Sequence, residues 1–110
     1  MLTDLEMKNI AVQQIYATFS ERGIAVNKIL LFGSRARGDF QPDSDWDFLV
    51  VTERELLWGE KKEIWRAISR ALAKHGISAD ILIKSQGQFD SDIHDKGKVT
   101  YYARLEGALV

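Results

Sequence analysis

Two aspartates separated by one residue, Asp45 and Asp47, are the strongest chemical signal in the sequence. They lie in the run DWDFLVV (residues 45–51), whose content of β-forming residues predicts a strand. Since side chains alternate along a strand, both carboxylates should project from one face and Trp46 from the other. Two carboxylates this close repel each other unless a cation lies between them. The pair therefore predicts an oxygen-ligated site for Mg²⁺.

A third carboxylate, Asp80, lies near the start of another predicted strand, SADILIK (residues 78–84). A charge flanked by apolar strand residues needs a partner or a function. If this strand pairs beside residues 45–51, Asp80 completes a cluster of three carboxylates. We expect Asp45, Asp47 and Asp80 to be both metal ligands and catalytic residues. Such a cluster can hold one ion on a triphosphate and a second that activates an incoming hydroxyl.

The dipeptide Gly33-Ser34 ends a third predicted strand, KILLF (residues 28–32), and opens a turn. Backbone N–H groups at such a turn can bind an anion, with Gly33 allowing close approach and Ser34 adding a hydroxyl donor. We assign Gly33, Ser34 and Arg37 to nucleotide binding, because a guanidinium can neutralise a triphosphate. Arg35 could do the same, although both arginines could also be ordinary exposed residues of a short helix. Together with the carboxylates, these residues predict phosphoryl or nucleotidyl transfer.

The elements that must position these residues follow from the spacing of apolar side chains. Helices are predicted over residues 3–22 and 59–75, where apolar residues recur at helical spacing between capping and stop signals. Residues 88–105 form a weaker helical segment before a short apolar end. The order α-β-turn-β-α-β-α predicts an α/β (α+β) fold, a small mixed sheet packed against helices. The whole chain, residues 1–110, is expected to form one domain.

The composition argues against several classes of function. A net charge of −1 gives no positive field of the kind that nonspecific binding to nucleic acid or anionic membranes needs. The absence of cysteine excludes disulfides, thiolate chemistry and Cys-based zinc sites. There is no apolar run of about 18 residues and no basic leader followed by an apolar stretch. We therefore expect a cytoplasmic protein that neither enters a membrane nor binds nucleic acid directly.

Some apolar residues are open to two interpretations. Leu56, Leu57 and Trp58 follow the second strand in an apparent loop. They could fill the core beneath the second helix or form an exposed patch for a partner, and core packing is the favoured interpretation. For Tyr101 and Tyr102 the same two interpretations, core packing and an exposed patch, both remain open.

The stretch GSRARGDFQPDSDWD contains Gly-Ser, ten intervening residues and then Asp-x-Asp. This spacing resembles the signature of the DNA polymerase β-like nucleotidyltransferases, and the chain is similar in length and layout to their minimal members, the MNT or MntA-type antitoxins. The resemblance implies a nucleotidyltransferase fold in which Gly33 and Ser34 contact the β- and γ-phosphates. It also implies that Asp45 and Asp47 hold Mg²⁺, while Asp80 is the third carboxylate and the base.

The resemblance further implies a partner. Minimal members of this kind are typically encoded with an all-α HEPN ribonuclease toxin and adenylylate a tyrosine near its active site. We therefore expect transfer of AMP from ATP to a tyrosine of such a toxin, with release of pyrophosphate and two Mg²⁺ ions in the active complex, in a type VII-like toxin–antitoxin pair. Two alternatives remain open: a nucleotidyltransferase with a small-molecule acceptor, and a catalytically idle module that neutralises a toxin by contact.

Overall fold

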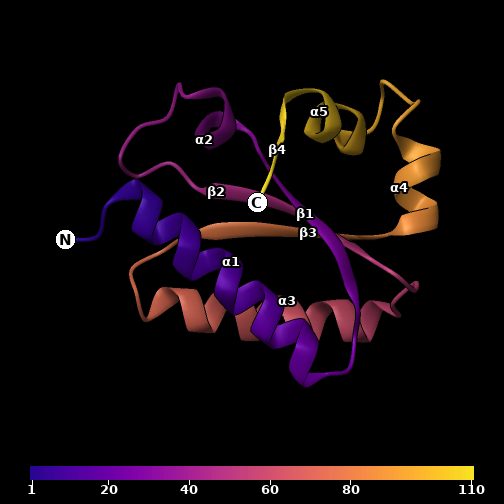
Figure 1. Ribbon diagram of the computed structural model, residues 1–110, viewed down its shortest axis with the longest axis horizontal. Coiled ribbons are helices and arrows are strands. Elements are labelled where there is room, and N and C mark those ends of the chain that lie inside the picture. The colour runs from indigo at the N-terminus through magenta and orange to yellow at the C-terminus, as the bar shows by residue number, and fades with distance from the viewer.

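The computed structural model, which describes residues 1–110, contains one four-stranded sheet with helices along both sides of its strands (Figure 1). The strands are β1 (Val26–Phe32), β2 (Trp46–Thr52), β3 (Ala79–Ser85) and β4 (Ala108–Leu109). Their spatial order is β3-β2-β1-β4. Because β1 is antiparallel to β2 and β4 whereas β2 and β3 are parallel, the predicted mixed sheet is confirmed.

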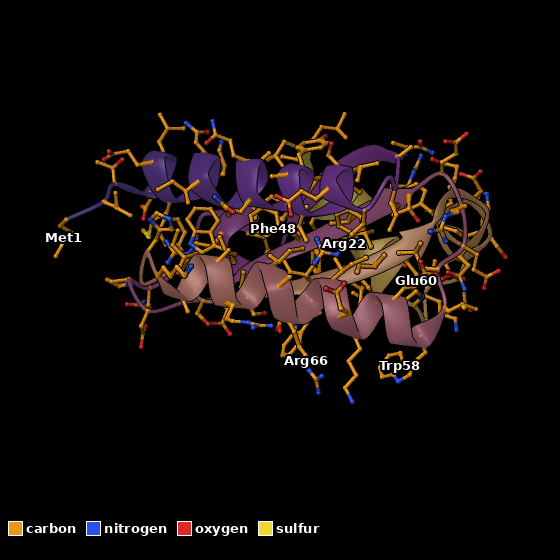
Figure 2. All side chains as sticks on the ribbon, turned by 90° about the horizontal axis from the view of Figure 1, so that it is seen from below. Met1, Arg22, Phe48, Trp58, Glu60 and Arg66 are labelled. Carbon is orange, nitrogen blue, oxygen red and sulfur yellow. The ribbon has the colours of Figure 1, made fainter.

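The helices form two groups. They are α1 (Asp4–Glu21), α2 (Ser34–Arg37), α3 (Trp58–Ala73), α4 (Gln86–Asp92) and α5 (Val99–Glu106). The long helices α1 and α3 lie side by side over one face of the sheet, with Arg22 between them (Figure 2). Its guanidinium donates two hydrogen bonds, of 2.6 and 2.8 Å, to the carboxylate of Glu63 and so joins the end of α1 to α3. The three shorter helices lie along the other side of the strands (Figure 1).

Local signals set the ends of α1. The backbone N–H of Glu6 donates to Thr3 Oγ1 at 3.1 Å, and the backbone N–H of Thr3 donates to Glu6 Oε1 at 3.0 Å. This reciprocal pair satisfies N–H groups that the first turn leaves without partners. The chain leaves the helix through Gly23, whose φ of +67° favours glycine. The helix predicted over residues 3–22 is therefore confirmed.

Strand alternation divides the core into two apolar layers. The larger layer lies between the sheet and α1 and α3; its members include Ile15, Phe19, Ile29, Leu31, Phe48, Val50, Ile64, Ile68, Ile81 and Ile83. The smaller layer lies on the other face and consists of Leu30, Leu49, Val51, Phe89 and Ala103. Asp47 shares a face with Leu49, and Asp80 shares a face with Leu82, which packs against the smaller layer. Both aspartates therefore lie on the face opposite α1 and α3.

The C-terminal segment differs from its prediction. The helical segment expected over residues 88–105 is two helices, α4 and α5, separated by a turn. The short apolar end forms β4, which was not predicted; Leu109 pairs with Leu30 and Ala108 with Leu31 of β1. So short a strand exists only because β1 offers it a free edge, and this partner is remote in sequence. None of the helices combines the length and apolar character needed to cross a membrane.

The apolar run after β2 is divided between core and surface. Leu56 is buried, with 5% of its surface exposed, whereas Leu57 and Trp58 are 75% and 76% exposed. The core interpretation is correct for Leu56 and wrong for the other two. For Trp58 the reason is helical geometry: it begins α3 six residues before Ile64, which places the two side chains about 120° apart around the helix axis. Ile64 faces the core, so Trp58 cannot.

Candidate active site

The candidate site begins at the end of β1, where the chain turns into α2 through Gly33. The backbone of Gly33 has φ 75° and ψ −159°, a combination essentially restricted to glycine. A side chain here would also overlap a carboxylate, because an added Cβ would meet Asp47 Oδ2 in direct collision. Gly33 is therefore required for two reasons. The turn needs a backbone conformation that glycine adopts, and the Asp47 carboxylate occupies the space that a side chain at residue 33 would take.

Strand pairing brings two of the three predicted carboxylates together. Asp47 and Asp80 are register partners in the parallel β2–β3 pair, and neighbouring strands lie about 4.8 Å apart. The predicted adjacency of these strands is confirmed. Asp45 is exposed and immediately precedes β2, which begins at Trp46, so the strand predicted from residue 45 starts one residue later. Trp46 is buried on the opposite face and stacks with Phe48, as alternation predicted.

Asp47 responds to its surroundings electrostatically. Partial burial raises the pKa of Asp47 above its ordinary value, and the negative charges of Asp80 and then Asp45 raise it further. The positive charge of Arg37 acts in the opposite direction and is the smallest of these influences. A cation between the carboxylates would remove the repulsion, so the electrostatics are those of a site that favours binding a positive charge.

The donor set fits Mg²⁺, although the side chains do not form a closed metal site as they lie. No three Asp, Glu, His or Cys side chains of the chain surround a common point closely enough to hold an ion. The expected gathering of all three carboxylates around one point is thus not present in this conformation. Mg²⁺ is commonly held by one or two carboxylates, with substrate phosphates and water as its other ligands. Asp47 and Asp80, with Asp45 beside them, supply oxygen donors of that kind.

Arg37 lies in α2, near the carboxylates, and its side chain is 45% exposed. Nη1 donates to Glu106 Oε2 at 3.0 Å, and Nε donates to Asp39 Oδ2 at 3.3 Å. Exposed ion pairs of this kind stabilise a protein by at most about 1 kcal/mol, so a triphosphate could displace them. Glu106 was missed by the sequence analysis because it lies on α5, far from the motif. The role of Arg37 in nucleotide binding stays a prediction, as does that of Ser34.

Arg35 has neither of the roles considered for it. Its side chain is only 2% exposed. The guanidinium donates to the backbone oxygens of Pro42 at 3.2 Å and of Ser44 at 2.9 and 3.2 Å, and it pairs with Asp4 at 3.1 Å. Both the triphosphate-binding and the exposed-residue interpretations are therefore wrong. Arg35 holds the loop that leads to Asp45, and sequence spacing gave no sign of this.

Arg35→Met should lower the free energy of unfolding by about 2–3 kcal/mol, because it leaves the Pro42 and Ser44 carbonyls without their donor. It also removes the cation–π contacts of the guanidinium with the rings of Phe40 and Trp46, whose centroids lie 4.4 and 4.5 Å from it. Thermal denaturation should show a fall in Tm of about 10 °C. The same change at the exposed Arg37 should shift Tm by less than about 3 °C. Equal shifts for the two variants would contradict this structural role.

A second stability prediction concerns Asp47. A carboxyl whose pKa is higher in the folded than in the unfolded chain binds its proton more tightly when folded. The free energy of unfolding therefore falls as the pH rises above the pKa that Asp47 has in the unfolded chain. At neutral pH the ionised carboxylate is destabilising. Asp47→Asn should raise Tm by about 2 °C at pH 7 in EDTA, where no divalent ion offsets the repulsion. Asp43→Asn, in the exposed loop, should leave Tm unchanged; a fall in Tm for Asp47→Asn would contradict the prediction.

Comparison with known proteins shows what this chain is similar to. A family model described as polymerase beta, nucleotidyltransferase matches residues 13–104. Two proteins of Methanocaldococcus jannaschii, each named as a candidate protein adenylyltransferase, are similar in sequence. One is 29% identical over 84 residues, covering 69% of this chain and 79% of that protein; the other is 36% identical over 52 residues, covering 47% and 52%. A solved structure described as a candidate minimal nucleotidyltransferase shares the fold, with a TM-score of 0.57, 18% identity and 93% of each chain covered.

Proposed function

Because the chain belongs to the polymerase beta nucleotidyltransferase family, we propose that it is a Mg²⁺-dependent protein adenylyltransferase that moves AMP from ATP to a tyrosine of a partner protein. The observation that carries this proposal is the pairing of Asp47 with Asp80 beside the Gly33 turn. It places carboxylates next to a backbone turn suited to phosphate, on one face of the sheet. The names of the two similar archaeal proteins support a protein as the acceptor.

The proposed reaction is an in-line displacement at the α-phosphorus of ATP. The tyrosine oxygen forms a bond to this phosphorus, the bond from phosphorus to the bridging oxygen of the β-phosphate breaks, and pyrophosphate leaves. Bound Mg²⁺, as one or two ions, would neutralise the charge of the triphosphate. The Gly33-Ser34 turn would hold the β- and γ-phosphates. Asp80 would accept the tyrosine proton, a role suited to its exposed position on the edge strand β3.

Asp45 and Asp47 would hold the metal, with Asp80 as the third ligand. Asp47 lies within β2, in the space that Gly33 leaves open, whereas Asp45 is exposed and immediately precedes β2. One carboxylate is thus held by the fold and the other is free to adjust when the triphosphate arrives. This combination suits an ion that keeps several water or phosphate ligands.

The partner that we propose is an all-α HEPN-type ribonuclease toxin, with the chain acting as its antitoxin. Support comes from the resemblance to minimal antitoxins and from the protein acceptor implied by the names of the archaeal relatives. The first check is the neighbouring open reading frame, which should encode an all-α protein with Arg, four to six residues and then His. If that reading frame encodes a protein of another kind, the proposed transferase chemistry is unaffected, but the proposal of a HEPN-type partner is wrong.

ATP that carries an isotopic label at one chosen phosphate tests the reaction directly. The chain is incubated with Mg²⁺, the neighbouring protein and ATP labelled at the α-phosphate, and label should appear on a tyrosine with one pyrophosphate released for each AMP transferred. ATP labelled at the γ-phosphate is the control and should leave the protein unlabelled. Label from the γ-position would show phosphoryl transfer instead. Label on an added small-molecule hydroxyl but not on protein would favour the small-molecule alternative.

A further inference from the structure

A groove of about 480 Å³ runs along β3 on its outer side. Residues 81–84 of β3 form one side, and the side chains of Trp58, Lys61, Lys62 and Trp65 on α3 form the other. Trp58 is 76% exposed and Trp65 is 43% exposed. Figure 2 shows Trp58 projecting from the side of α3 that faces away from α1. Two exposed tryptophans on one helix face mark a surface suited to binding, because isolated chains rarely expose so much aromatic area together.

The backbone of β3 is unpaired along this groove. β3 is an edge strand with β2 as its only neighbour. The backbone N–H of Trp46 in β2 donates to the carbonyl of Ser78 at 3.0 Å. Since the direction of backbone groups alternates along a strand, those of Ala79, Ile81 and Ile83 point toward the open edge. An extended segment laid in the groove would find unused donors and acceptors at these three residues.

The groove is locally basic, although the chain has a net charge of −1. Neither Lys61 nor Lys62 takes part in an ion pair in the structure. Lys84 has a single carboxylate partner, Asp92, at 3.4 Å. Charge complementarity therefore favours an occupant with acidic residues, and the tryptophans favour one with apolar residues as well.

We propose that the free edge of β3, together with Trp58 and Trp65, binds an extended apolar and acidic segment of the acceptor protein as a fifth strand. We further propose that this pairing delivers the acceptor hydroxyl to Asp80. The inference rests on the proposed function, because it assigns a docking surface to the protein acceptor of that reaction.

The position of Asp80 on β3 supports the delivery. Asp80 directly precedes Ile81, which lines the groove, and its side chain lies on the opposite face of the sheet from that of Ile81. A strand paired along β3 would alternate in the same way. One set of its side chains would meet the tryptophans of α3, and the other set would lie on the face that carries Asp80. Anchoring and reacting residues of the acceptor are therefore separated by an odd number of positions.

A synthetic peptide of about eight residues tests the docking. Leucine alternates with threonine, one threonine position carries tyrosine, and two aspartates stand at the end away from the tyrosine. Calorimetry measures affinity, and amide hydrogen exchange locates the contact. We expect the peptide to bind and to slow exchange at Ile81 and Ile83, whose N–H groups face the edge. Methylating the peptide nitrogens that face β3 should weaken binding at least about ten-fold.

Two variants of the chain test whether the peptide binds in the groove. Trp58→Ala/Trp65→Ala should weaken peptide binding at least about ten-fold, because exposed aromatic anchors carry much of such an interface. Leu105→Ala, at an apolar residue of α5 that is 64% exposed, should not change it. Lys61→Glu/Lys62→Glu should weaken binding of the acidic peptide but strengthen binding of a version with lysine in place of aspartate. This reversal cannot result from misfolding.

The outcomes separate the inference from the proposed function. No binding, or binding without protection of Ile81 and Ile83, overturns the docking inference even if the chain binds ATP and transfers AMP. Protection of β3 by the peptide in a chain that neither binds nor uses ATP contradicts the proposed function and with it the delivery to Asp80. A concentration-dependent dimer that competes with the peptide, and is lost in Trp58→Ala/Trp65→Ala, shows a second copy as the occupant and overturns the acceptor assignment.

Discussion

Gly33→Ala is expected to lower the rate of nucleotidyl transfer by at least about 100-fold, because a displacement of about 1 Å at a reacting centre has effects of this size. The alanine Cβ would overlap the Asp47 carboxylate, which must move out of the place it occupies beside Asp80. The backbone conformation at residue 33 is also unfavourable for any residue with a Cβ, and strain of about 1–3 kcal/mol should appear as a lower Tm. The measurements are label transfer from ATP and thermal denaturation.

Gly23→Ala is the matched control for this variant. Gly23 also has a positive φ, of 67°, but an added Cβ there meets nothing within 4 Å. The control therefore shares the positive φ, which any residue with a Cβ adopts unfavourably, and lacks the collision with Asp47. We expect it to lower Tm while transfer proceeds at the wild-type rate. Equal loss of transfer in both variants would show that Gly33 acts through stability alone and not through the carboxylate.

Asp45→Asn/Asp47→Asn is expected to lower AMP transfer by at least about a thousand-fold, which corresponds to about 4 kcal/mol in the transition state. Asparagine keeps the size of the side chain but removes the negative charge that would hold the cation. Folding should survive, since Asp45 is exposed and since partial burial, together with repulsion from the other two carboxylates, raises the pKa of Asp47. Transfer from α-labelled ATP, circular dichroism and Tm measured on the same preparation separate lost chemistry from lost structure.

The same variant distinguishes catalysis from neutralisation by contact. A contact-only antitoxin would protect cells fully from the partner toxin with both carboxylates replaced, whereas a catalytic antitoxin would not. Ribonuclease activity of the purified toxin is measured after incubation with wild-type chain, with the double variant and with Asp43→Asn, which changes only a loop carboxylate. Undiminished neutralisation by the double variant, with no AMP on the toxin, would contradict the catalytic proposal.

Local features of the molecule could be predicted because their causes are local. The capping box at Thr3 and Glu6 joins residues three apart, and alternation along β2 separates Asp47 from Trp46 whatever the strand pairs with. The need for glycine at residue 33 was likewise predicted from its place at the end of a strand, although for close approach to phosphate. The structure adds a second reason, the space taken by Asp47.

Features that join remote parts of the chain were decided only by the tertiary structure. The sequence allowed Asp80 to reach Asp47 only if the two strands paired, and the observed register places them opposite each other. Arg35 carries a guanidinium, a group that commonly binds anions, yet the loop that follows Arg35 encloses this group. No spacing rule predicts such burial, because it depends on carbonyl groups that the folded loop turns inward.

The amino-acid sequence by itself determined the chemistry of this protein: which residues carry negative charge, where the chain turns tightly, and which side chains share a strand face. The tertiary structure decided the neighbours: that Asp80 stands beside Asp47, that Glu106 holds Arg37, and that Trp58 lies outside the core. The physical reason is the range of the interactions. Backbone conformation and alternation act over a few residues, whereas register and burial depend on apolar surfaces that meet only when the whole chain has folded.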